Sequence, residues 1–253
     1  MWSFKYWRRR RILAGSAVSQ EEWKQAEESL PLLEGLTDDE RRRLREWATL
    51  FLHEKSLESV QGLVLDSEAA RRIALQACLP ILNLDFDWLR GWASVIIYPD
   101  AFVVDHEEMD SAGVVHRIRE ARSGESWDRG PLIISSTDVD AGRRRDGYNV
   151  ILHEVAHKLD ALNGVADGFP PLHGDMPREA WTRAFTRAFE DINQKLDAGH
   201  ETPLDPYAAE TPEEFFAVAT EAFFEIPEVL AGAYPDVFEQ LARFYRVWPL
   251  KMP

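Results

Sequence analysis

The sequence predicts an α+β protein in which a small mixed sheet lies between helices near the two ends of the chain. Three observations predict this class. Apolar residues recur at helical spacing before residue 80 and again in the last third, β-branched runs fill the middle, and no linker rich in Gly, Ser or Pro divides these parts. With 253 residues, 45% of them hydrophobic, the chain is long enough to bury a substantial core.

The first 18 residues form a basic segment. It combines aromatic side chains with a run of arginines, in the order Trp2, Phe4, Tyr6, Trp7 and then arginine at positions 8–11. Aromatic and basic residues together are typical of contact with an anionic membrane surface, but this segment is shorter than a typical interfacial helix. We therefore expect residues 1–18 to be a flexible basic tail.

Helix signals begin directly after this segment. Ser19 and Glu22 have the spacing of a capping box, which predicts the start of a helix. A second helix is expected to open at Thr37 or Asp38, because apolar residues follow at helical spacing, and a third is expected over residues 67–77. The N-terminal part of the domain is therefore predicted to be a helical flank.

Short runs rich in β-branched residues predict about four strands in the middle of the chain. These runs are 93–98, 102–104, 114–118 and 132–135. Helical spacing returns in the last third, over residues 181–192, 215–225 and 237–247. We predict a single domain over residues 19–253, with the helical flank at 19–80, the small sheet at 81–136 and the catalytic helices at 146–253.

Charge and cysteine content exclude several classes of protein. The chain has 29 Lys and Arg against 44 Asp and Glu, and its net charge of −15 disfavours binding to nucleic acid. Cys78 is the single cysteine, so an internal disulfide and a cysteine-based zinc site are excluded. No apolar run has the length of a transmembrane helix or a signal peptide, so we expect no transmembrane segment and a cytoplasmic location.

The motif His153-Glu154-Val155-Ala156-His157 carries the predicted chemistry. On a helix, residues four apart lie on one face, so His153 and His157 can bind one metal ion, and Zn²⁺ is the ion this motif typically holds. Glu154 follows the first histidine and is placed to act as general base. The alternative is a core helix with two hydrogen-bonded histidines. It is disfavoured by the preceding strand, by Asp160 one turn on, and by Asn163-Gly164, which is typical of a left-handed helix cap.

A carboxylate is the best candidate for the third ligand. No histidine follows at the metzincin spacing, and a helix is marked by Thr211 at its N-cap and Pro212 at its first position. Glu214 and Glu221 share one stripe of that helix with small apolar residues. Glu214 has the alternative of closing a capping box with Thr211, whereas a metal would explain both carboxylates.

Tyr207 lies seven residues before Glu214, in the loop that enters this helix. Its phenol is a candidate to stabilise the oxyanion that forms when a peptide carbonyl is attacked. The alternative for a tyrosine in a loop is simple packing.

Several blocks spread over nearly the whole chain match a known family of bacterial peptidases. They are residues 80–84, 98–100, 130–131, 146–150, 153–160, 207–208 and 214–217. In these blocks the chain resembles the Mlc titration factor A family. The resemblance implies a zincin-like core of the gluzincin type, similar to the peptidase domain of anthrax lethal factor, with His153, His157 and Glu214 as zinc ligands, Glu154 as base and Tyr207 near the oxyanion. Ser136 stands where the family pattern has Trp, and we therefore expect a different subsite preference.

The resemblance further implies an aminopeptidase-like activity on short peptides and a partner, the glucose-responsive repressor Mlc. In this interpretation one Zn²⁺ activates water, Glu154 accepts its proton, and strand 132–135 binds the substrate main chain by edge pairing. The acidic stretch 196–242, which has no Lys or Arg, would attract a free α-amino group or would simply be a solvated surface. The alternatives are a protein that sequesters the repressor with a weak peptidase site, and a structural zinc site, for which the sequence offers no convincing fourth ligand.

Overall fold

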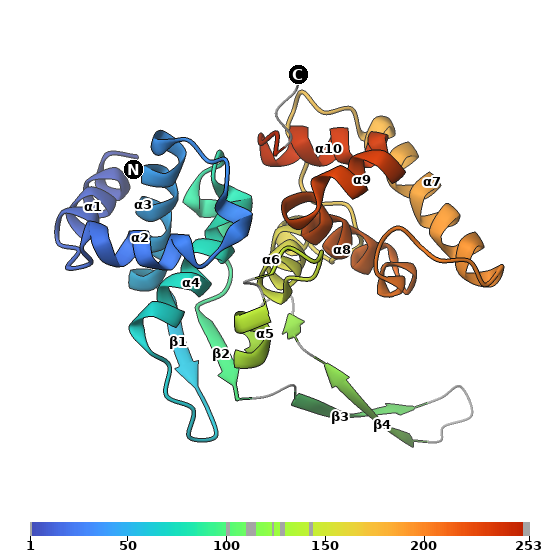
Figure 1. The fold of residues 1–253 in the computed structure, drawn as a ribbon, viewed down its shortest axis with the longest axis horizontal. Helices are drawn as coiled ribbons and strands as arrows, with labels where there is room; N and C mark the ends of the chain where they lie inside the picture. The colour runs from blue at the N-terminus through green and yellow to red at the C-terminus, as the bar shows by residue number, and fades with distance from the viewer. Residues whose placement is uncertain are drawn as a thin grey trace.

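The structure is a computed structural model, and it describes residues 2–99, 102–109, 115–122, 124–126, 130–141 and 144–249. A helical block formed by the first part of the chain lies beside a second helical block formed by the last part, and strands lie along one side of both (Figure 1). The first block contains α1 (Trp2–Ala14), α2 (Gln20–Glu28), α3 (Asp38–Glu54) and α4 (Ser67–Cys78). The second contains α6 (Val150–Asp160), α7 (Arg178–Asp197), α8 (Pro212–Glu225), α9 (Pro227–Ala233) and α10 (Pro235–Tyr245). The α+β class is confirmed.

Capping interactions explain why the first helices begin where they do. Ser19 and Glu22 form a complete capping box at α2, as the sequence predicts. At α3 the N-cap is Thr37, and its capping box partner is Glu40. The third predicted helix is α4, which Asp66 caps by accepting the backbone N–H of Ala69 at 2.7 Å.

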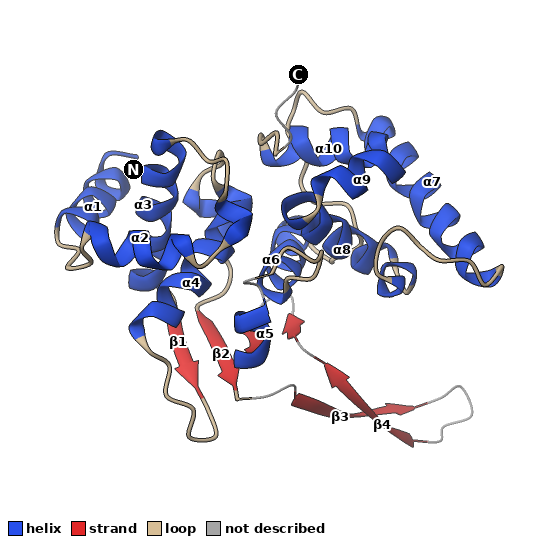
Figure 2. Ribbon diagram, viewed as in Figure 1, coloured by secondary structure: helices blue, strands red, loops and turns tan. Residues whose placement is uncertain are grey.

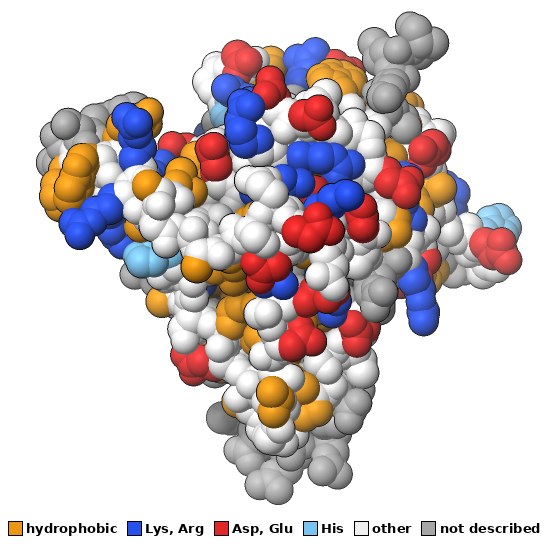
Figure 3. Space-filling view, turned by 60° about the vertical axis from the view of Figure 1, so that its left-hand side comes forward, with side chains coloured by type: hydrophobic (Ala, Val, Ile, Leu, Met, Phe, Trp, Pro, Cys, Tyr) orange, Lys and Arg blue, Asp and Glu red, His pale blue; other side chains and the backbone are white. Residues whose placement is uncertain are grey.

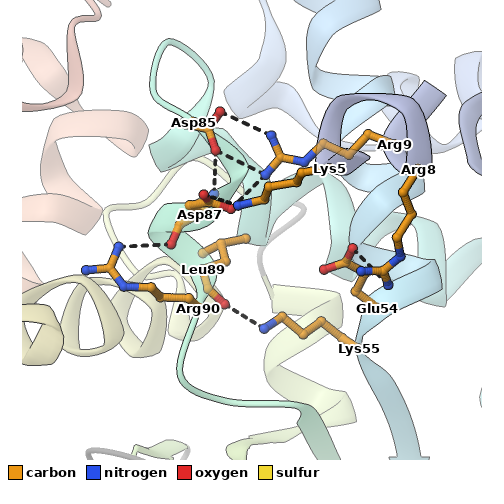
Figure 4. Close-up of polar contacts among 9 residues, drawn as sticks. All are labelled: Lys5, Arg8, Arg9, Glu54, Lys55, Asp85, Asp87, Leu89 and Arg90. Carbon is orange, nitrogen blue, oxygen red and sulfur yellow. Dashed lines mark hydrogen bonds and ion pairs between the residues drawn. The ribbon is translucent and has the colours of Figure 1, made fainter. Parts of the chain in front are cut away.

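Residues 2–14 form helix α1, so the prediction of a flexible tail is wrong for these residues. Arg9 forms ion pairs with Asp85 and Asp87, 2.8 to 3.1 Å long, and Lys5 is also paired with Asp87 (Figure 4). Arg8 lies 3.4 Å from Glu54 at the end of α3. These partners lie far along the chain, and for that reason the local sequence gives no sign of them.

The strands form two separate sheets rather than one (Figure 2). The larger sheet has the order β1 (Ser56–Ser59), β2 (Ser94–Tyr98), β6 (Leu132–Ser135), β5 (Gly124–Ser126), and the smaller pairs β3 (Phe102–Met109) with β4 (Val115–Arg122). Strands β1, β2 and β6 are parallel, and β5 runs antiparallel to β6. All four predicted strands exist, but two of them belong to the smaller sheet, and β1 and β5 were not predicted. Strand β1 is short and mostly exposed, so it lacks an apolar pattern.

The core lies between the larger sheet and the helices. On β2 and β6 the inward residues pair across the strands, Val95 with Leu132 and Ile97 with Ile134, and all four are buried. In the second block an aromatic cluster joins α7, α8 and α10, and Trp181 stacks on Phe185 with ring centroids 4.2 Å apart. Helix α8 is buried along most of its length, which gives any carboxylate on it an apolar environment.

The short helix α5 (Ser136–Ala141) directly follows β6. Ser136 starts this helix, and its hydroxyl donates to the backbone carbonyl of Pro99 at 3.0 Å. Within the described ranges, no helix has the length and apolar character that crossing a bilayer requires.

Candidate metal centre

Helix α6 carries the His-Glu-Val-Ala-His motif on a well-defined start. Asn149 is its N-cap, and its side-chain oxygen accepts the backbone N–H of Leu152 at 3.1 Å. The apolar flank of α6 is buried, as the sequence predicts, which fixes the direction of the two histidines. The helix ends at Asp160 and is followed by one 3-10 turn, η4 (Ala161–Asn163). Gly164 has φ +142° and ψ −102°, so the predicted left-handed cap is wrong in its conformation.

Helix α8 brings Glu214 to the same place. Thr211 caps the helix by accepting the backbone N–H of Glu214 at 3.3 Å. The Glu214 carboxylate lies against the histidines, with Oε2 3.0 Å from His153 Nε2 and 3.4 Å from His157 Nε2. The two predicted roles of residue 214 are therefore divided between its backbone, which is capped, and its carboxylate, which faces the histidines.

The three side chains fit a metal ion. One ligand atom from each of His153, His157 and Glu214 lies within 4.8 Å of the other two, and the two Nε2 atoms are 3.1 Å apart. Separations of about 3.3 Å are the edges of a tetrahedron around an ion bound at roughly 2 Å. Among the described residues, the buried Oε2 of Glu214 has only the two imidazoles as neighbours of this kind, as expected of a ligand atom. Two imidazoles and one carboxylate are a donor set typical of zinc with a position left for substrate.

Glu221 orients the first histidine from behind. Its Oε1 lies 2.8 Å from His153 Nδ1, and its Oε2 accepts the backbone N–H of Asn149. Burial by itself would lower the pKa of His153, but the hydrogen bonds with Glu214 and Glu221 outweigh it and raise that pKa well above its ordinary value. Nδ1 thus faces Glu221 and Nε2 faces Glu214 and the predicted metal position, which is the orientation of a metal-ligating histidine held by a carboxylate.

A buried network supports Glu221 and was not predicted from the sequence. Asn149 is 1% exposed, and its Nδ2 donates to Gln76 Oε1 at 2.8 Å and to Glu225 Oε1 at 2.9 Å. Burial raises the pKa of Glu225 to about 7. Asn149 thus connects the start of α6 with the end of α8 and with α4. Gln76 and Glu225 are polar residues that lie among apolar residues of their helices, and this pattern could have indicated a buried polar contact.

Glu154 and Tyr207 lie beside the three side chains. Glu154 follows His153 on α6, is 2% exposed, and its charge is among those that raise the pKa of His153. Tyr207 lies on η5 (Pro206–Ala209), and its hydroxyl donates to Glu214 Oε1 at 3.2 Å. Its ring centroid is 6.0 Å from that of His153, and 43% of the residue is exposed. Tyr207 therefore borders the three side chains and is partly exposed to solvent.

The other candidates lie outside the centre. His173 packs against Trp88, and its Nε2 lies 2.8 Å from the backbone carbonyl of Phe244, so it holds the two helical blocks together. His200 is exposed. Asp160 is buried, accepts the backbone N–H of Gly168 at 2.7 Å, and has a pKa raised to about 7 by burial.

The predicted edge role of strand 132–135 is wrong. Strand β6 pairs with β2 on one side and with β5 on the other, so its main chain is already used. Strand β5 is the antiparallel edge strand of the larger sheet, and it packs beside α6. The sequence could not identify it, because three residues are too few to show a strand pattern.

The chain is similar to known proteins over most of its length. The family described as glucose-regulated metallo-peptidase M90 matches residues 4–246. A protein named Mlc titration factor A from Cronobacter sakazakii is 40% identical over 224 residues, which cover 88% of this chain and 84% of the relative. Proteins of the same name from Escherichia coli strain 55989 and Salmonella arizonae are 40% and 43% identical, over 88% and 87% of this chain and 85% and 89% of their own length.

Proposed function

Because this chain belongs to the glucose-regulated metallo-peptidase family M90, we propose that it is a zinc-dependent peptidase with His153, His157 and Glu214 as ligands of one Zn²⁺. The convergence of these three ligand atoms within 4.8 Å is the observation that carries the proposal. When bound, zinc would acidify a coordinated water and polarise the peptide carbonyl.

The protein's own residues perform the remaining steps of the proposed reaction. Glu154 accepts a proton from the attacking water and passes it to the leaving amine. Tyr207 changes its hydrogen bond from Glu214 Oε1 to the carbonyl oxygen of the substrate as negative charge develops there. Glu221 keeps the His153 ring in its orientation throughout.

We propose that the substrate lies along β5 and that its free amino group is attracted by carboxylates. An extended peptide can pair with the edge of a sheet, and among the described strands β5 is the edge strand next to α6. Glu214, Glu221 and Glu225 of the acidic stretch lie in the helix that borders the site, whereas Asp205 and Glu210 are exposed on either side of Tyr207. These exposed carboxylates favour an aminopeptidase.

The matched relatives are named for titration of Mlc, and this name supports a second candidate function. In this alternative the chain binds a related transcriptional repressor and the peptidase site is weak. Glu154 lies between the two histidines in the sequence, and its presence favours the peptidase over the second candidate, because a protein that only binds a repressor does not need a general base.

Metal analysis combined with two variants tests the proposal. Elemental analysis of chelator-free protein should find one zinc per chain, and Glu214→Ala should lose it. Glu210→Ala removes an exposed carboxylate four residues away and should keep it. Glu154→Gln should retain zinc and lower peptide turnover by at least about 10²-fold. Stoichiometric zinc in Glu214→Ala would refute the ligand assignment, and full activity in Glu154→Gln would refute the mechanism.

A matched pair of peptides tests the aminopeptidase part separately. A peptide with a free N-terminus should be cleaved faster than its N-acetylated form, and Asp205→Asn with Glu210→Gln should reduce the difference. Added salt should reduce it too, because charges are screened beyond roughly 10 Å at 0.1 M ionic strength. Equal cleavage of both peptides would indicate an endopeptidase. The second candidate would be favoured if the protein binds the repressor tightly and cleaves neither peptide, whether or not the repressor is added to the cleavage assay.

A further inference from the structure

Helix α1 has an inner face that is bound to the rest of the protein. Lys5, Arg8 and Arg9 reach carboxylates of other segments (Figure 4). The Arg9 guanidinium also lies over the rings of Trp47 and Phe86, 5.7 and 5.6 Å from their centroids. Ile12 and Leu13 pack against the core. The helix is therefore held in one orientation, and its opposite face is directed outward.

The outer face of α1 carries aromatic and basic side chains together. Phe4 is 70% exposed, Tyr6 66% and Trp7 53%. Phe4 stacks on Trp7 with centroids 5.9 Å apart, Arg11 lies 5.6 Å from the Trp7 ring, and Arg10 lies 5.9 Å from the Tyr6 ring. In Figure 3 this face is the projection at the left, where hydrophobic and basic side chains lie side by side. We call these five residues, Phe4, Tyr6, Trp7, Arg10 and Arg11, the α1 outer face.

We propose that the α1 outer face docks this protein reversibly on the surface of a lipid bilayer that contains anionic phospholipid. Aromatic rings of this kind are stable at the level of lipid headgroups, and basic residues beside them are attracted to anionic lipid. Five basic residues and no acidic one lie in residues 1–20, while the rest of the chain has a charge of −20. The molecule would therefore approach a negatively charged surface with α1 first.

Lipid fits this face better than nucleic acid does. Three aromatic rings more than half exposed gain little from a phosphate backbone, whereas a headgroup region removes their apolar surface from water. A DNA duplex that extends beyond α1 would also be repelled by the acidic remainder of the chain. Arg10 and Arg11, which form no ion pair with the described residues, together with three rings predict binding that is weak and sensitive to salt.

Co-sedimentation of the full chain with vesicles tests the proposal. Vesicles of phosphatidylglycerol and phosphatidylcholine should bind the protein at low salt, and vesicles of phosphatidylcholine alone should bind much less. Arg10→Gln with Arg11→Gln should lower the partition coefficient roughly 30-fold, the factor expected for two basic residues. Phe4→Ser with Trp7→Ser should also lower it. About 0.5 M salt should release most of the bound wild-type protein.

Matched controls are available outside the α1 outer face. Arg183→Gln with Arg187→Gln makes the same charge change on exposed positions of α7, and Trp248→Ser removes a tryptophan that is 51% exposed. Both controls should bind vesicles like the wild type, and circular dichroism should show that all variants are folded. The proposal is overturned if anionic vesicles do not bind the protein at low salt, or if the α1 variants bind as well as the controls. It is also overturned if these variants lose only binding to a short DNA duplex or self-association.

Discussion

Replacing Asn149 by alanine tests whether one buried side chain holds the two ligand helices together. Its Oδ1 caps α6 through the backbone N–H of Leu152, and its Nδ2 donates to Gln76 on α4 and Glu225 on α8. Alanine removes all three hydrogen bonds and leaves the two buried acceptors without this donor. The backbone N–H of residue 149, which Glu221 accepts, is retained.

The expected loss of stability follows from these contacts. Loss of an N-cap costs about 1 kcal/mol, and each buried acceptor deprived of its donor costs roughly 1 to 3 kcal/mol. Because neighbouring contributions are not additive, we expect Asn149→Ala to lower the free energy of unfolding by about 3 to 5 kcal/mol. Asn149→Ser keeps a capping oxygen and should recover about 1 kcal/mol of this.

Urea unfolding of metal-free protein measures this loss, and titration with zinc measures the effect on the site. Zinc affinity should fall by about 10- to 100-fold, because Asn149 holds the segment that supports Glu221. Asn193→Ala is the control, since its side chain makes one hydrogen bond to the carbonyl of Phe189 on α7. If Asn149→Ala unfolds within about 0.5 kcal/mol of the wild type and binds zinc equally well, the network does not hold the helices.

Three further predictions concern neighbouring residues. Burial raises the pKa of Glu225 from 4.5 to about 7. The stability that protonated Glu225 contributes to the fold is therefore fully present below pH 4.5. It is lost as the pH rises to about 7, which lowers the free energy of unfolding by up to about 3 kcal/mol. Glu225→Gln should therefore be more stable relative to the wild type at pH 8 than at pH 5 in thermal melts, and exposed Glu228→Gln should show no such change. Gly168→Ala should lower the free energy of unfolding in urea by roughly 2 to 4 kcal/mol, because residue 168 has φ +76° and a Cβ there would lie 2.4 Å from the Pro212 carbonyl oxygen. Gly174→Ala, where a Cβ would meet open space, should lower it far less. Tyr207→Phe should lower kcat by about 10²-fold with KM little changed, and an unchanged kcat would return Tyr207 to a packing role.

Features written in local sequence were predicted well. The capping box of Ser19 and Glu22, the cap at Thr211 and the i, i+4 histidines all depend on residues within one or two helical turns. The same holds for the stripe that places Glu214 and Glu221 toward His153. Helical periodicity alone is sufficient to bring such residues onto one face.

Features that depend on distant partners could not be predicted. Asn149 and Gln76 are 73 residues apart, and Arg9 and Asp85 are 76 residues apart, so neither pair has a local signal. The sequence predicts a flexible tail in place of α1 because the apolar residues of this segment do not form one stripe. The ion pairs of Arg9 with Asp85 and Asp87 are visible only in three dimensions. Strand β5 is defined by its pairing with β6 rather than by its own residues.

The contacts at the two ends of α6 and α8 explain how the ligands can be in place before a metal ion binds. The start of α6 is joined to the end of α8 through Asn149, Glu221 and Glu225. The end of α6 is joined to the start of α8 through the loop at Gly168, whose N–H is accepted by Asp160 and whose Cα lies against Pro212. The ligand residues lie between these two joints, so neither helix can slide without breaking one of them. If zinc binds as proposed, it would require little ordering of the protein, and its binding free energy would add to the stability of an already folded domain.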